Sequence, residues 1–156
     1  MNKKTVSVIF RILLILLIFA TVAHAFYQSA LPVKESAEVS DKVGEIIEEI
    51  LPPEKPAGQF VQKNIRKLAH FTEFCMLGLA SAGLIVAIGG RREWWLCGYG
   101  LLFCLIIAVC DEFIQGFVDR GSAVSDVFID FCGATFVFLI LILVARLIGL
   151  KKIKKA

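Results

Sequence analysis

The stretch LAHFTEFCMLGLASAGLIVAI, residues 68–88, decides the fold. A helix crosses the hydrocarbon core of a bilayer with about 20 predominantly apolar residues, and this run is long enough to do so. It carries His70 and Glu73 near its first end. A second apolar run covers about residues 94–114, after the short Gly-Gly-Arg-Arg connection at 89–92. Because that connection is tight and rich in glycine, the two runs predict a helical hairpin in the membrane.

Two further apolar runs flank this hairpin, one at about residues 6–27 and one from near Asp126 to residue 150. Hydrophobic residues make up 58% of the chain and the mean hydropathy is +0.78, which disfavours a water-soluble fold. The formal net charge is only +3, and the basic residues flank apolar runs, which excludes a nucleic-acid-binding surface. We therefore expect an all-α integral membrane bundle of four transmembrane helices.

The segment at 28–67 is expected to be an external loop that contains a short amphipathic helix. Apolar residues recur there at helical spacing opposite a set of acidic residues, and Leu51-Pro52-Pro53 should end the helix, because proline lacks the amide hydrogen. The apolar positions are Val39, Val43, Ile46, Ile47 and Ile50, and the acidic ones are Asp41, Glu45, Glu48 and Glu49.

The first apolar run has two interpretations, a transmembrane span or a signal sequence. Lys3 and Lys4 precede it, and Ala23-His24-Ala25 resembles a cleavage site, while its length also suits a crossing. Both interpretations place the next residues on the outer side. The expected division is 1–27 for this span, 28–67 for the loop, 68–150 for a three-span core and 151–156 for a basic cytoplasmic tail.

Basic residues predict the orientation. Four alternating spans place the N-terminal lysines, Arg91-Arg92 and the tail on one side, which the positive-inside rule assigns to the cytoplasm. Lys63, Arg66 and Lys67 oppose this assignment, since they flank the second span on the outer side. The five cysteines all lie in apolar stretches, so they are expected to be packing residues rather than a disulfide framework.

Polar and charged residues gather near the outer ends of the last three spans. Ionisable groups in a span are costly when they face lipid, so we expect these side chains to point inward and form one polar cluster. Asp126 has a simpler interpretation beside Ser125, as a cap at a helix N-terminus. The candidate functional residues are Arg66, His70, Glu73, Asp111, Glu112, Gln115, Arg120, Asp126 and Asp130.

The order and spacing of these residues resemble the VanZ-like family. The matching series is Arg66-Lys67-Leu68-Ala69-His70-Phe71 with Glu73, Asp111-Glu112 with Gln115, Arg120, and Asp126 with Asp130 and Gly133. Two positions depart from the family pattern, because Val118-Asp119 stands where Pro-Gly is usual and Asp130 where asparagine is common. The resemblance implies a bacterial cytoplasmic-membrane protein related to one associated with low-level teicoplanin resistance, and it implies no known reaction.

Two classes of function remain open. A binding or accessory protein would use the cluster to recognise a membrane lipid, a lipid-linked envelope component or a lipoglycopeptide. An enzyme would use His70 and a carboxylate such as Glu112 for proton transfer, with Arg66 or Arg120 holding an anionic headgroup.

A metal variant of the enzyme would use His70 and Glu73 with acidic residues of the other spans. Such a ligand set favours magnesium or calcium before zinc. Our prediction is nevertheless that the protein binds no metal. The cofactor and the oligomeric state stay undetermined.

Overall fold

The computed structural model describes residues 2–89, 94–118 and 121–154, and these residues form helices and no strand. The elements are α1 (Lys3–Ala30), α2 (Val33–Ile50), α3 (Pro56–Ala87), α4 (Trp94–Phe117) and α5 (Val124–Lys154). Four of them, α1, α3, α4 and α5, are long and apolar enough to cross a membrane. The predicted all-α bundle of four spans with one additional amphipathic helix is therefore confirmed.

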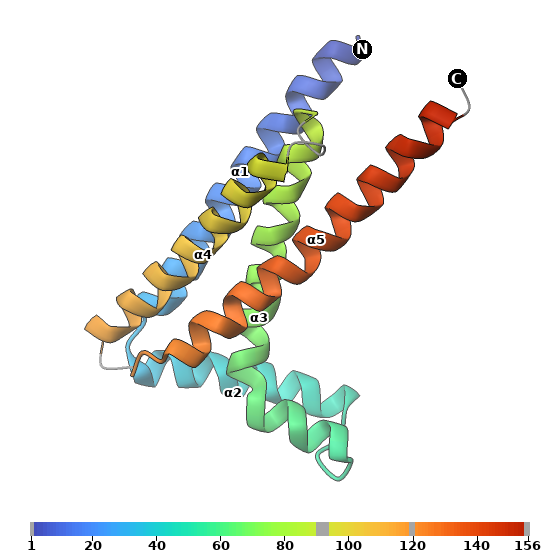
Figure 1. Ribbon diagram of the computed structural model, residues 1–156. Coiled ribbons are helices and arrows are strands. Elements are labelled where there is room, and N and C mark those ends of the chain that lie inside the picture. The colour runs from blue at the N-terminus through green and yellow to red at the C-terminus, as the bar shows by residue number, and fades with distance from the viewer. Residues whose placement is uncertain (1, 90–93, 119–120, 155–156) are drawn as a thin grey trace.

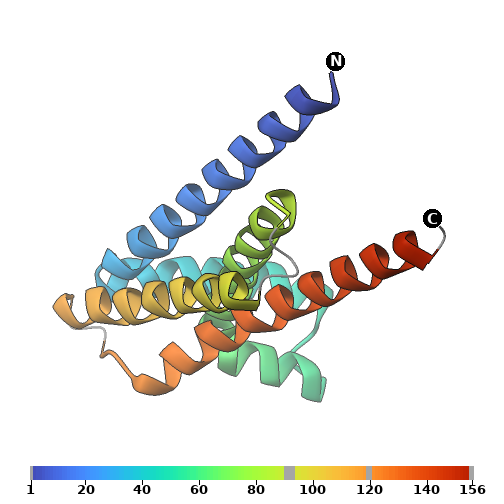
Figure 2. The same ribbon diagram turned by 45° about the horizontal axis from the view of Figure 1, so that its top comes forward.

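Helix α3 is the centre of the bundle and contacts every other helix. Both chain termini lie at one end of the molecule, together with the end of α3 and the beginning of α4 (Figure 1). Helix α2 runs across the opposite end, where α4 ends and α5 begins (Figure 1). The C-terminal half of α5 extends away from the other helices in both views (Figure 2). The end of the bundle that α2 crosses therefore contains the beginning of α3, the end of α4 and the beginning of α5.

Two glycines let the backbones of α3 and α5 come into direct contact, with no side chain between them. A Cβ atom on Gly78 would collide with the backbone of Ala134, and one on Gly133 would collide with the backbone of Phe71. Small residues at such contacts are typical of membrane helices, which gain stability from close van der Waals packing. The contact of Gly133 with Phe71 fixes α3 against α5 directly beside His70 and one turn from Asp130.

The buried core lies along the contact between α3 and α5. Phe74 and Leu77 of α3 pack with Cys104 and Ala108 of α4 and with residues of α5. At the terminal end of the bundle, the Nε atom of Arg11 donates a hydrogen bond of 3.1 Å to the carbonyl oxygen of Ala87. That bond satisfies one of the carbonyls that the end of α3 leaves without a helical partner. All five cysteines are free.

Helix α3 begins earlier than the sequence pattern indicated. The second span was expected from about Leu68, whereas the helix starts at Pro56 and takes in part of the predicted loop. Proline is well tolerated at the first helical position, where its missing amide hydrogen costs nothing. Helix α2 ends at Ile50 as expected, and the Nε2 atom of Gln62 binds it through the Gly44 carbonyl at 3.3 Å and the Glu48 Oε1 atom at 2.8 Å.

Candidate functional site

Polar residues of α3, α4 and α5 meet at the end of the bundle that α2 crosses. Arg66, His70 and Glu73 lie along one face of α3, since residues three and four apart share a helix face. They approach Asp111, Glu112 and Gln115 from the last turns of α4 and Asp130 from the second turn of α5. Asp111, Glu112, Gln115 and Asp130 are all buried. The structure thus brings most of the sequence-predicted residues into one cluster.

Gln115 joins three helices through its side-chain amide. Its Oε1 atom accepts a hydrogen bond of 2.7 Å from the Arg66 guanidinium on α3. Its Nε2 atom lies 3.0 Å from Asp111 Oδ2, 3.0 Å from Glu112 Oε1 and 3.4 Å from the hydroxyl of Ser29 on α1. An amide both donates and accepts hydrogen bonds, so it can link a cation to two carboxyl groups. Gln115 therefore orients Arg66 and both acidic side chains.

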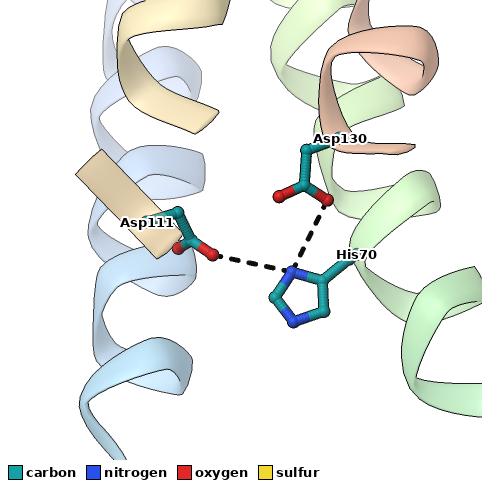
Figure 3. Close-up of side chains that lie close together, drawn as sticks. All are labelled: His70, Asp111 and Asp130. Carbon is teal, nitrogen blue, oxygen red and sulfur yellow. Dashed lines mark ion pairs between the residues drawn. The ribbon is translucent and has the colours of Figure 1, made fainter. Parts of the chain in front are cut away.

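The imidazole of His70 lies between two buried carboxyl groups from different helices. Its Nδ1 atom is 3.6 Å from Asp111 Oδ2 on α4 and 3.6 Å from Asp130 Oδ1 on α5. Figure 3 shows both carboxyl groups pointing toward that nitrogen. The His70 side chain is only 14% exposed, and both acidic side chains are fully buried. These contacts become ion pairs when the imidazole is protonated.

Glu112 points elsewhere, although it is the direct neighbour of Asp111. Its Oε2 atom accepts a hydrogen bond of 2.8 Å from the backbone amide of Ala123, immediately before α5 begins. The first amides of a helix have no helical partner, and a carboxylate there is favourable. Glu112 therefore stabilises the start of α5, and the carboxyl groups nearest His70 are those of Asp111 and Asp130.

Two of the remaining candidate residues, Glu73 and Asp126, lie at the edge of the cluster. Glu73 faces α1, where its Oε1 atom is 3.8 Å from Nε2 of His24. Asp126 lies in the first turn of α5, the position where a helix favours an anion, and it accepts a hydrogen bond from Ser125 at 3.2 Å. Arg120 falls outside the described residues.

A cleft of roughly 560 Å³ opens between α1, α2 and α3 beside the cluster. Three helices supply its wall. Helix α3 contributes Arg66, Ala69, His70, Thr72, Glu73 and Met76, and helices α1 and α2 contribute Ala20, Thr21, His24, Gln28, Ser36, Val39 and Ser40. A smaller cavity of roughly 170 Å³ lies on the other side of His70, where α3 meets the start of α5. Both spaces reach the same histidine.

Sequence reasoning missed the contribution of α1. Ser29 is fully buried against Gln115, and His24 faces Glu73, yet neither was a candidate. His24 belongs to the cleavage-like Ala-His-Ala pattern, which directed attention to processing. One signal was present, because Thr21, His24 and Gln28 follow each other at helical spacing in an otherwise apolar run. That stripe indicates a polar face toward the bundle.

One ligand atom each of His70, Asp111 and Asp130 lies within 4.8 Å of the other two, so these three residues, within the part of the chain that the structure describes, could hold a metal ion. The metal variant considered from the sequence combined His70 and Glu73 with acidic residues of the other spans. The structure keeps His70 with one acid from each of the last two spans, whereas Glu73 faces α1.

The comparisons with known proteins identify a family. Searches of the curated proteins and of the solved structures gave no match. The family described as VanZ/LLP1 matches residues 8–145, which includes most of the first and last spans, the two spans between them and the whole polar cluster. The chain therefore belongs to the VanZ/LLP1 family, and it is a multi-pass membrane protein of that family.

Proposed function

We propose that this protein binds a membrane lipid in the cleft between α1, α2 and α3, and that this binding lowers the sensitivity of a bacterium to teicoplanin. The observation that carries the proposal is the cleft itself, which opens at the bundle surface next to the polar cluster. Its volume of roughly 560 Å³ falls in the range of small-molecule sites, about 300–1,000 Å³.

The lining of the cleft changes along its length in the way that an amphipathic ligand requires. Arg66 marks the end near α2, together with the hydroxyls of Ser36 and Ser40. Met76 and Ala20 mark the far end, which is apolar. With a rise of 1.5 Å per residue, Arg66 and Met76 are separated by about 15 Å along α3. An anionic headgroup at Arg66 and an acyl chain at Met76 would therefore match the chemistry at both ends.

The connection to teicoplanin comes from the family resemblance and from the chemistry of the drug. Teicoplanin is a lipoglycopeptide, so it shares an acyl chain with membrane lipids and with lipid-linked envelope components. A protein that holds such a molecule in an open cleft can alter its availability at the membrane surface without converting it. The proposal therefore needs affinity for an acyl chain and a polar headgroup, and no turnover.

A membrane-embedded enzyme is the second candidate, and one observation favours it. His70 lines the cleft and lies between Asp111 and Asp130, an arrangement that can orient an imidazole for proton transfer to a bound substrate. Chemical conversion of a lipid-linked substrate by the purified protein, lost in His70→Asn, would favour this candidate over binding alone. Glu112 would play no direct part in this proton transfer, since its carboxylate accepts a hydrogen bond from the backbone amide of Ala123.

We also propose that the protein resides in the bacterial cytoplasmic membrane with both termini in the cytoplasm. Lysines lie at the beginning of α1 and a basic stretch lies at the end of α5, which supports this orientation through the positive-inside rule. The cleft and α2 would then lie at the outer leaflet, where a lipoglycopeptide acts on the envelope. The placement matters to function, because an inward cleft would not meet the drug.

Cysteine labelling from outside intact cells tests this orientation. In a variant without the native cysteines, a cysteine in place of Lys55, between α2 and α3, should react with a membrane-impermeant reagent. A cysteine in place of Ile153 should react only after the membrane is opened. External labelling at position 153 with protection at position 55 would reverse the orientation and place the cleft inside.

Filling the apolar end of the cleft should displace the lipid. Met76→Trp adds bulk to the cleft wall without changing a charged residue, so the amount of lipid that copurifies, measured by mass spectrometry, should fall by at least about half. Leu79→Trp is the matched control, because Leu79 is similarly exposed on α3 and lies outside the lining. Equal lipid content in both folded variants would exclude the cleft as the binding site.

Expression in a susceptible Gram-positive host tests the biological role. Wild-type protein should raise the inhibitory concentration of teicoplanin more than that of vancomycin, because only teicoplanin carries an acyl chain. At matched membrane abundance, Met76→Trp should lose this effect and Leu79→Trp should keep it. A wild-type protein that leaves both drugs equally potent would remove the resistance role from the proposal.

A further inference from the structure

In the triad of His70, Asp111 and Asp130, the two fully buried carboxyl groups lie at the spacing of metal ligands from the imidazole rather than at that of hydrogen-bonded partners. Hydrogen bonds between nitrogen and oxygen span about 2.7–3.2 Å, whereas both carboxyl oxygens lie 3.6 Å from the His70 Nδ1 atom. Nitrogen and oxygen ligands bind a divalent ion such as zinc at about 2.0–2.2 Å, so two ligands of one tetrahedral ion are about 3.4 Å apart. The two separations from Nδ1 are close to that value, and the ligand atoms of all three residues lie within 4.8 Å of one another.

Asp130 provides an independent observation. Its side chain is fully buried, and neither of its carboxyl oxygens takes part in a hydrogen bond with any residue that the structure describes. The carboxyl group nonetheless points into the space between His70 and Asp111 (Figure 3). A buried carboxylate is costly unless it is paired, hydrogen-bonded or bound to a metal, and the His70 contact at 3.6 Å is an ion pair only when the imidazole is protonated. A cation at this position would satisfy the side chain.

We propose that His70, Asp111 and Asp130 bind one divalent first-row transition metal ion. With Glu73 outside the set, one imidazole nitrogen and two carboxyl oxygens remain. The nitrogen ligand favours ions such as manganese or zinc over the magnesium or calcium expected from the sequence, which prefer oxygen ligands alone. Two carboxylates close together in an apolar bundle repel each other, and a divalent cation offsets that repulsion. This site goes beyond the proposed lipid binding and does not require it.

The surroundings of the triad fit such a site. Gln115 donates a hydrogen bond of 3.0 Å to Asp111 Oδ2, the kind of outer contact that holds a metal ligand in position. The smaller cavity gives access, because both His70 and Asp130 line it. Three protein ligands leave at least one coordination position for water or another ligand. Lys63 and Lys67 line the same cavity and could attract an anionic ligand to that position.

Manganese binding to the untagged full-length protein in detergent tests the proposal. Mn²⁺ is the probe because it prefers oxygen and nitrogen ligands to the cysteine thiols of this chain. After treatment with a chelator, the wild type should bind one equivalent, measured by the electron paramagnetic resonance of free Mn²⁺. Asp130→Asn keeps the size of the side chain and removes its charge, so affinity should fall at least about 10-fold.

Matched variants separate ligand loss from misfolding. Asp126→Asn makes the same change one turn earlier on α5, outside the triad, and should bind Mn²⁺ like the wild type. The bound ion should show coupling to an imidazole nitrogen in pulsed resonance spectra. His70→Asn should abolish that coupling, and His24→Asn, at the other histidine of the chain, should preserve it. A folded wild type that binds no Mn²⁺, equal affinity in the two aspartate variants, or a nitrogen signal that survives His70→Asn would each overturn the metal site.

Discussion

The backbone contact between α3 and α5 is the constraint on which the rest of the structure depends. Gly78 and Gly133 allow it, since a Cβ atom at either position would collide with the opposite backbone. Lipid is as apolar as the side chains that face it, so membrane helices associate through such close packing rather than through the hydrophobic effect. The contact holds His70 of α3 against Asp130 of α5, and α4 then adds Asp111 from the other side. The cluster therefore follows from the helix packing.

The cluster also explains why so many ionisable side chains can be tolerated in an apolar protein. Each lies near the end of the bundle that α2 crosses, and most have a partner of opposite or complementary chemistry. Gln115 links Arg66 to two carboxyl groups, and Glu112 stabilises the start of α5. Asp130 differs from the other buried acids that the structure describes, because neither of its carboxyl oxygens has a hydrogen bond and its ion pair with His70 requires a protonated imidazole. Gln115 and Glu112 therefore hold the helices together, whereas Asp130 remains available for a ligand.

The sequence predicted the helices well because each apolar run is long and uninterrupted. Helix α2 could be predicted from its alternating apolar and acidic faces, and its end from the two prolines. The start of α3 could not, because Pro56 follows those prolines and resembles a further break, whereas it occupies the first position of the helix. Packing against α2 through Gln62 supports the extra turns, and that tertiary contact has no signature in the local pattern.

The composition of the cluster could be predicted, but its internal pairing could not. Asp111 and Glu112 are adjacent in sequence and therefore point about 100° apart on a helix. Which of them faces His70 depends on the rotation of α4 about its axis, and that rotation is set by packing. Ser29 of α1 was missed for a related reason, since a single hydroxyl in a span costs little and gives only a weak signal. Residues that join helices need the assembled bundle to be recognised.

Crosslinking tests the central claim, the convergence of three spans on His70, most directly. In a protein without its native cysteines, a cysteine at position 70 should react with one at position 111 or at position 130 through a short bifunctional reagent. A cysteine at position 113 should not react with the cysteine at position 70. Phe113 is on the same helix as Asp111, but its side chain is 67% exposed on the surface of the bundle. Efficient linkage of 70 to 113, or failure of both 70 to 111 and 70 to 130 in the folded protein, would contradict the account.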